Sequence, residues 1–130
     1  MTYRQTYQKY GAKRTTAPDG ERFDSKFEAK IYADLLLRQR AGEITEIERQ
    51  FQVVMVPYTE DGRALPTLAV RHRIDFRVRL ADGTYELIEA KGLELADWQR
   101  RKKWLEALWL PAHPDHVYVV VKQRGGRRAA

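Results

Sequence analysis

The sequence has no cysteine and no long apolar run, and both absences limit what the protein can be. Without cysteine it can form neither disulfides nor thiolate metal sites, whereas a hard cation on oxygen ligands remains possible. No apolar run approaches the roughly 20 residues that cross a bilayer, and no secretory signal pattern opens the chain. The 130 residues suffice for one domain with a single core. We therefore expect a cytoplasmic protein without a membrane segment.

Positive charge is concentrated at the two ends of the chain. The formal net charge is +6, of which residues 1–20 carry +3 and residues 122–130 carry +4, so that the 101 residues between them sum to −1. Basic arms usually bind polyanions, and nucleic acid is the first candidate, although a solvated tail that aids solubility is an equal alternative. We expect a basic arm over residues 1–20, a folded domain over 21–121 and a basic tail over 122–130.

The pattern of apolar residues and turn signals predicts a small α/β layer structure with a mixed sheet. A helix is expected over residues 26–39, ended by Ala41-Gly42, and a strand over 44–56, stopped by Pro57. A hairpin of two strands over residues 72–91 follows, with an Asp-Gly turn. The remaining elements are a helix over 95–109 and an apolar strand over 117–121, which we expect to be central and buried on both faces.

The hairpin carries the residues that point most directly to chemistry. Asp75 lies in a segment of strict apolar and polar alternation, which predicts a half-buried strand with Asp75 on its polar face. Glu89 and Lys91 are two residues apart on the neighbouring strand and therefore share a face. Two adjacent carboxylates repel each other, and a divalent metal ion relieves that repulsion. Metal-assisted cleavage of a phosphodiester needs such a set.

Glu28 is an anomaly in the first expected helix, because a helical projection places it in the middle of the apolar stripe. A carboxylate there is costly unless it is paired, capped or bound. The segment Ser25-x-x-Glu28 matches a capping box, and taken alone this favours a structural role. Together with Asp75 and Glu89, however, the pattern favours a role in the site over a structural role. We expect Glu28 to face the same sheet edge and join the carboxylates.

The combination of a helix with Glu28, a strand with Asp75 and the motif Glu89-x-Lys91 resembles the PD-(D/E)XK nuclease superfamily. Residues 9–29 and the motifs around Asp75 and Glu89 are similar to a small phage and prophage family in that superfamily, grouped with Holliday-junction resolvases and phage endonuclease I. The likeness extends over residues 9–121. The proline that names the superfamily motif is replaced here by Ile74, as in many members.

The resemblance implies a fold, a reaction and roles for residues. The fold would be a restriction-endonuclease-like core with the order α-β-β-β-α-β. Asp75 and Glu89 would ligate Mg2+ or Mn2+, helped by the backbone carbonyl of Ala90, and Lys91 would orient or activate the attacking water. Glu28 would bind a second metal ion or a metal-bound water. No small-molecule cofactor is expected.

The activity that follows from the resemblance is a metal-dependent, structure-selective DNA endonuclease, Holliday-junction resolvase-like, acting on branched DNA in the cytoplasm of a bacterial host. Its products would carry a 5′-phosphate and a 3′-hydroxyl. Symmetric cleavage of a junction needs two active sites and therefore implies a homodimer. Two alternatives remain, a DNA-binding module on an inactive nuclease scaffold and a nicking or restriction-type nuclease for duplex DNA. The apolar candidates for a dimer interface are Trp104, Leu108, Trp109 and Leu110.

Several basic residues are candidates for contacting DNA, because they share the strand face of Asp75, lie on the second helix or belong to the basic ends. They are Arg71, Arg73, Arg77, Arg101, Lys102, Lys13, Arg14, Arg124, Arg127 and Arg128. His72 lies three residues from Asp75 and is expected on the opposite face, as a surface histidine. Trp98 is expected in the core. His113 and His116 are not expected to hold a metal ion without further ligands.

Overall fold

The computed structural model describes residues 15–23, 25–92 and 94–123. The chain divides into two compact units, residues 1–44 and 45–130. Among the described residues, none of the helices has the length and apolar character needed to cross a membrane. The expected basic arm and tail lie mostly outside the described ranges.

The first unit consists of a short hairpin and a helix. Strand β1 (Thr15–Thr16) pairs antiparallel with β2 (Arg22–Phe23), so part of the segment expected to be a basic arm forms a short strand. Helix α1 (Lys26–Arg40) follows. The Tyr32 hydroxyl donates a hydrogen bond to Asp19 Oδ2 at 2.6 Å, and the Tyr32 ring lies 5.1 Å from that of Phe23. These contacts fix the helix against the hairpin.

Helix α1 begins and ends where the sequence predicts. The Ser25 hydroxyl accepts hydrogen bonds from the backbone N–H groups of Phe27 and Glu28, which are among the donors that a helix leaves unpaired at its start. At the other end, Gly42 adopts a φ of +87°, a conformation that glycine reaches without strain. The helix therefore has a specified start and stop.

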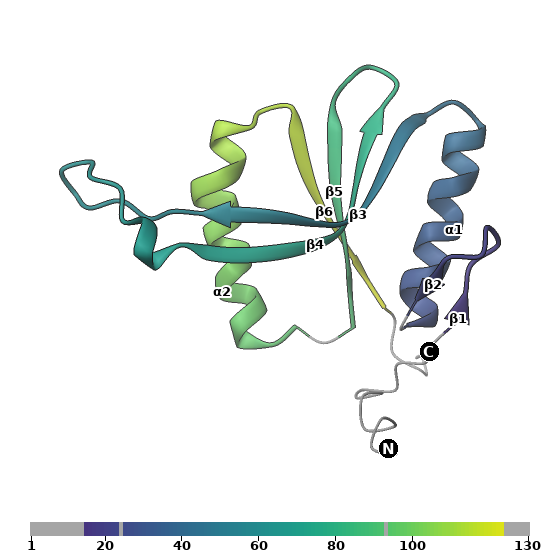
Figure 1. Ribbon diagram of the computed structural model, residues 1–130, viewed down its shortest axis with the longest axis horizontal. Helices are drawn as coiled ribbons and strands as arrows, with labels where there is room; N and C mark the ends of the chain where they lie inside the picture. Colours follow the sequence, from purple (N-terminus) through teal and green to yellow (C-terminus); the bar gives the residue numbers. More distant parts are fainter. Residues whose placement is uncertain (1–14, 24, 93, 124–130) are drawn as a thin grey trace, which may run out of the picture. The chain divides into compact units, whose positions relative to one another are not determined.

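The second unit is built on a mixed four-stranded sheet in the order β3-β4-β5-β6 (Figure 1). Its strands are β3 (Ile44–Met55), β4 (Val70–Leu80), β5 (Tyr85–Lys91) and β6 (His116–Lys122), and β3 starts at the last residue of the first unit. Strands β4 and β5 are antiparallel, whereas β5 and β6 are parallel. The predicted α/β class with a mixed sheet is confirmed.

The β4–β5 hairpin closes through Gly83, which has a φ of +90°. Leu80 N–H donates to the Thr84 carbonyl at 2.8 Å and completes the turn. The paired register runs from Arg79 opposite Tyr85 to Phe76 opposite Ile88. Asp75 is therefore the first residue of β4 beyond the stretch that pairs with β5.

A helical segment covers one face of this sheet. Helix α2 (Ala96–Trp104) continues into a π-helical turn (Leu105–Trp109) and a 3-10 turn (Leu110–Ala112). The helix predicted over 95–109 is thus confirmed in extent, but its last turn is widened ahead of Pro111, which has no N–H to continue an α-helical ladder. Of the apolar interface candidates, Leu108 is exposed, whereas Trp104, Trp109 and Leu110 pack against the core.

Strands β3 and β4 form a long two-stranded ribbon. Its far half, the half that lies beyond the end of the pairing with β5, crosses α2 (Figure 1). Gln50 in β3 has a φ of +57°, which is unusual for a residue with a side chain and typical of a bulge that bends a strand. One core cluster of the unit lies beneath the far half of the ribbon, and its buried members are Val53, Met55, Ile74, Leu87 and Leu105. Another 3-10 turn (Pro66–Leu68) precedes β4.

The prediction that the last strand is central and buried on both faces is wrong. Strand β6 stands at the edge of the sheet and pairs only with β5 in the part of the chain that the structure describes. Val117 is 58% exposed, and most of the other strand residues are half-buried. An unbroken apolar run indicates a strand, but it does not distinguish a central position from an edge covered on one side.

Candidate active site

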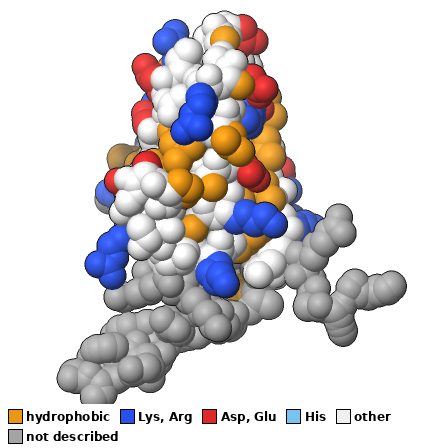
Figure 2. Space-filling view, turned by 90° about the vertical axis from the view of Figure 1, so that its right-hand side faces the viewer, with side chains coloured by type: hydrophobic (Ala, Val, Ile, Leu, Met, Phe, Trp, Pro, Cys, Tyr) orange, Lys and Arg blue, Asp and Glu red, His pale blue; other side chains and the backbone are white. Residues whose placement is uncertain are grey.

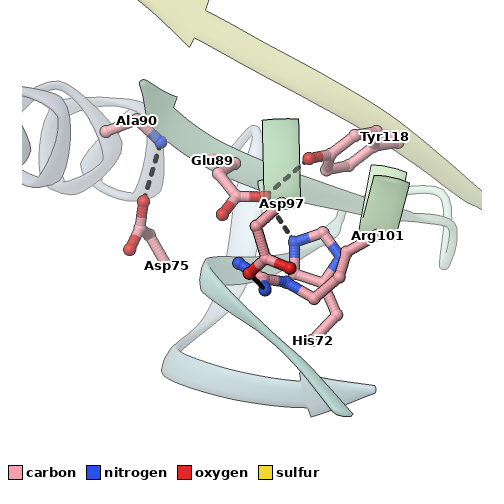
Figure 3. A network of polar contacts seen from close by, with 7 residues as sticks. All are labelled: His72, Asp75, Glu89, Ala90, Asp97, Arg101 and Tyr118. Carbon is pink, nitrogen blue, oxygen red and sulfur yellow. Dashed lines mark hydrogen bonds and ion pairs between the residues drawn. The ribbon is translucent and has the colours of Figure 1, made fainter. Parts of the chain in front are cut away.

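Asp75 lies where β4 separates from β5, and its side chain replaces a missing strand contact (Figure 3). Its Oδ2 accepts a hydrogen bond from the Ala90 backbone N–H at 2.7 Å. In a continued ladder a backbone carbonyl would accept from this group. The carboxylate is therefore positioned by the sheet itself, at the point where the two strands part.

Glu89 is the most buried carboxylate of the site, with 5% of its surface exposed. Its Oε1 accepts a hydrogen bond from the Tyr118 hydroxyl at 2.6 Å and lies 3.0 Å from His72 Nε2 (Figure 3). Because an ionised carboxylate can only accept, His72 donates through its Nε2–H. One oxygen of Glu89 is thus held by two side chains, one from β4 and one from β6.

The two carboxylates have different affinities for protons. Burial raises the pKa of Asp75 to about 6, against the stabilising Ala90 N–H, and the negative charge of Glu89 raises it further. Burial also raises the pKa of Glu89, but the hydrogen bonds from His72 and Tyr118 outweigh this effect, so that its pKa is lowered overall. Glu89 is therefore ionised well below neutral pH, whereas Asp75 ionises near neutral pH.

Lys91 completes the group that the sequence predicts. Its charge lowers the pKa of both Asp75 and Glu89, and its Nζ lies 5.1 Å from the centre of the Trp98 ring. Trp98 is buried, as expected of a core residue. An ammonium over an aromatic face is attracted by the ring, so Trp98 helps to hold Lys91 beside the carboxylates. The structure thus brings Asp75, Glu89 and Lys91 together.

The expectation that His72 is a surface residue is wrong, because only 1% of it is exposed. The far half of the ribbon folds over α2, so the strand face that carries His72 and Ile74 is turned into the core. The pairing of β4 with β5 does not extend to His72. Glu89 therefore reaches His72, although the alternation of side chains along the strands would place the two on opposite faces of the sheet. The sequence contained a signal, since His72 is in phase with the apolar residues Ile74, Phe76 and Val78.

Glu28 lies in the first turn of α1 and is half-buried. Its backbone N–H bonds to the Ser25 hydroxyl, so the N-cap half of the predicted capping box is present. Glu28 belongs to the first unit and Asp75 to the second, and the approach of Glu28 to the other carboxylates stays a prediction.

The basic residues of β4 divide into two kinds. Arg71 and Arg73 are exposed, and their side chains have no hydrogen bond or ion pair within the described ranges. They alternate with the buried residues of β4 as Asp75 does. Arg77, in contrast, donates two hydrogen bonds to Glu48, at 3.1 and 2.8 Å, and its guanidinium lies over the Phe51 ring. Arg77 is therefore held within the protein, whereas Arg71 and Arg73 can meet a ligand.

The other DNA-contact candidates are paired or lie outside the described residues. Arg101 pairs with Asp97 on α2 (Figure 3), and Lys102 pairs with Glu106 at 2.9 Å. Figure 2 shows Lys and Arg side chains interspersed with acidic and apolar ones on the face in view. The candidates at the two ends, which the structure does not describe, are Lys13, Arg14, Arg124, Arg127 and Arg128.

His113 and His116 have partners of another kind. The His113 ring stacks on Trp109 with centres 3.7 Å apart, and its Nδ1 lies 2.8 Å from the Trp109 carbonyl oxygen. The ring nitrogens of His116 lie 2.9 Å from Asp115 Oδ1 and 3.3 Å from Arg77 Nη1. Over the described ranges, no three histidine, aspartate or glutamate side chains are grouped so as to hold a metal ion.

Comparison with known proteins gives a family without an assigned function. No curated protein and no solved structure matches the chain. A family model does match, over residues 7–123, which include the whole sheet and all of the residues of the candidate site. The chain therefore belongs to the family described as "Protein of unknown function (DUF1064)".

Proposed function

We propose that the protein is a metal-dependent, structure-selective DNA endonuclease, similar to Holliday-junction resolvases, on a restriction-endonuclease-like core. The observation that carries the proposal is the group of two carboxylates and a lysine at the point where β4 leaves β5. The order α1-β3-β4-β5-α2-β6 also agrees with the core of helix, three strands, helix and strand that such nucleases share.

The residues present fit a divalent cation held by oxygen. Asp75 and Glu89 are mostly buried, and the charge of Glu89 adds to the cost of ionising Asp75, which a cation would offset. The N–H and C=O groups of one strand residue point to the same side, so the Ala90 carbonyl faces the side on which its N–H meets Asp75. Mg2+ prefers such a set of few protein oxygens, completed by water and phosphate oxygens. When bound, the ion would polarise the phosphoryl group and lower the pKa of bound water.

Lys91 supplies a fixed positive charge beside the two carboxylates. Its place over the Trp98 ring restricts where the ammonium can lie. In this proposal Lys91 orients the attacking water and stabilises the negative charge that develops on the phosphoryl group. Glu28 would add a further carboxylate from α1.

Binding of DNA is assigned to exposed positive charge. Arg71 and Arg73 lie on one face of β4, spaced by two residues, or about 6.7 Å along the strand. This distance equals about two steps from phosphate to phosphate along the axis of a duplex, at roughly 3.4 Å per step of one strand. The basic ends would add contacts without sequence preference. Cleavage of a junction on both sides would need a second copy of the chain.

The test is incubation of the purified protein with a four-way junction, a flap, a duplex and a single strand, each with Mg2+, Mn2+ or EDTA. We expect cleavage of the branched substrates with either metal, none with EDTA, and none by the Asp75→Asn variant. Tight junction binding without cleavage under any of these conditions would instead identify a DNA-binding module. Equal rates on duplex and junction would identify a duplex nuclease.

A further inference from the structure

We infer that Tyr118 and His72 are positioning residues that restrict Glu89 to binding a metal ion through one oxygen, and that this makes the site select Mg2+ and Mn2+ over Ca2+. The inference rests on the proposed metal site at Asp75 and Glu89. It assigns a role to two residues outside the predicted site, and neither of them is required to touch the metal ion or the substrate.

The first step concerns Glu89. A carboxylate has about four lone-pair positions, two on each oxygen. Oε1 already accepts from Tyr118 at 2.6 Å and from His72 at 3.0 Å, so both of its positions are used by the protein. Oε2 is therefore the oxygen that remains for a cation.

The second step concerns the rigidity of this arrangement. His72 and Glu89 are buried, with 1% and 5% of their surfaces exposed, and Tyr118 packs against the core that contains Ile74 and Leu87. The three side chains come from β4, β5 and β6, so a rotation of Glu89 would break two hydrogen bonds in a dry environment. Such bonds are costly to lose, and their removal is expected to loosen the carboxylate.

The third step concerns Asp75, which is restricted in a similar way. Its Oδ2 accepts the Ala90 N–H at 2.7 Å, which favours Oδ1 as its metal-binding oxygen. A set in which each carboxylate offers one oxygen suits Mg2+ and Mn2+, since Mg2+ requires near-octahedral geometry and keeps several waters. Ca2+ takes six to eight oxygens and commonly binds carboxylates through both, which the hydrogen bonds to Glu89 oppose.

The experiment is calorimetric titration of Mn2+, Mg2+ and Ca2+ into wild type, Tyr118→Phe and Tyr85→Phe. Tyr85 serves as the matched control, because it lies on β5 and stacks on His116 at 4.5 Å without touching Glu89. We expect wild type and Tyr85→Phe to bind Mn2+ more tightly than Ca2+. The Tyr118→Phe variant should bind Mn2+ about tenfold more weakly than wild type. Its ratio of Ca2+ affinity to Mn2+ affinity should rise by a similar factor. His72→Leu should act in the same direction, and His72→Gln, which retains an N–H donor, should restore part of the selectivity.

The outcomes separate the inference from the proposed function. If wild type binds none of the three ions, both are overturned. If wild type binds Mn2+ but Tyr118→Phe keeps the Ca2+ to Mn2+ ratio of wild type, the inference fails and the metal site stands. An equal loss of affinity for all three ions would also contradict it, because that result indicates only a looser fold. Thermal unfolding of each variant without metal establishes that the folded protein is being titrated.

Discussion

Asp75 carries an unfavourable charge in the folded protein when no cation is present. Its pKa is about 6 in the folded state, raised first by burial, against about 3.9 in an unfolded chain. The folded state therefore holds the proton more tightly, and the free energy of unfolding falls as pH rises from about 4 to about 6. Above that range the loss is complete and amounts to up to about 3 kcal/mol.

Replacement of Asp75 by asparagine should therefore stabilise the metal-free protein at pH 7.5 and have little effect at pH 4. Asparagine keeps an oxygen that can accept the Ala90 N–H, so the change removes the charge and preserves the contact. Urea unfolding in EDTA at the two pH values measures the difference. Asp34→Asn, on an exposed face of α1, is the control. A lower stability of Asp75→Asn at pH 7.5 would contradict the unfavourable charge.

Lys91 allows catalysis and binding to be separated at a single residue. It is one of 24 basic residues, so Lys91→Ala should leave junction binding within a few fold. Loss of a positioned cation beside the developing phosphoryl charge should lower the cleavage rate by roughly 10²–10³. Single-turnover cleavage and a binding titration measure the two effects. Lys103→Ala, which removes an exposed charge from α2, should leave both unchanged. Wild-type cleavage by Lys91→Ala would show that this is not the site of reaction.

At the scale of elements, the start of α1 offers a test of the two roles of Glu28. Glutamine also serves at this position of a capping box, so Glu28→Gln should be nearly silent if the role is structural. If Glu28 is a site residue, the same change should lower cleavage strongly without changing the melting temperature by more than a degree or two. Ser25→Ala is the complementary variant, because loss of the N-cap should cost about 1 kcal/mol in stability.

Local signals predicted most of the elements, whereas the way they pack was harder to foresee. The ends of α1 are marked by Ser25, which caps backbone N–H groups, and by Gly42, which adopts a positive φ. The β4–β5 turn is marked by Gly83, which also adopts a positive φ. The grouping of Asp75, Glu89 and Lys91 followed from the same hairpin. The burial of His72 depends on the bend of the ribbon over α2, a tertiary feature that strand parity does not contain. The edge position of β6 likewise depends on how many strands the sheet has.

For the whole molecule, the distribution of charge makes the binding of DNA sensitive to salt. Replacing Arg124, Arg127 and Arg128 by glutamine removes three positive charges and keeps the length of the chain. If each arginine contacts one phosphate, the slope of log affinity against log salt concentration should flatten by roughly 2–3. Filter binding at several salt concentrations measures the slope on junction and duplex. An unchanged slope would indicate that the tail takes no part in binding.

The hydrogen bond from Ala90 to Asp75 makes a backbone amide into a spectroscopic reporter of the site. This amide proton points at a carboxylate rather than at a carbonyl of the next strand, so its chemical shift follows the charge on that carboxylate. It should move with a midpoint near pH 6 as Asp75 titrates. It should also move when a cation is added, and the same signal should be insensitive to both in Asp75→Asn. The resonance of this one amide proton would thus reveal occupancy of the site without a substrate.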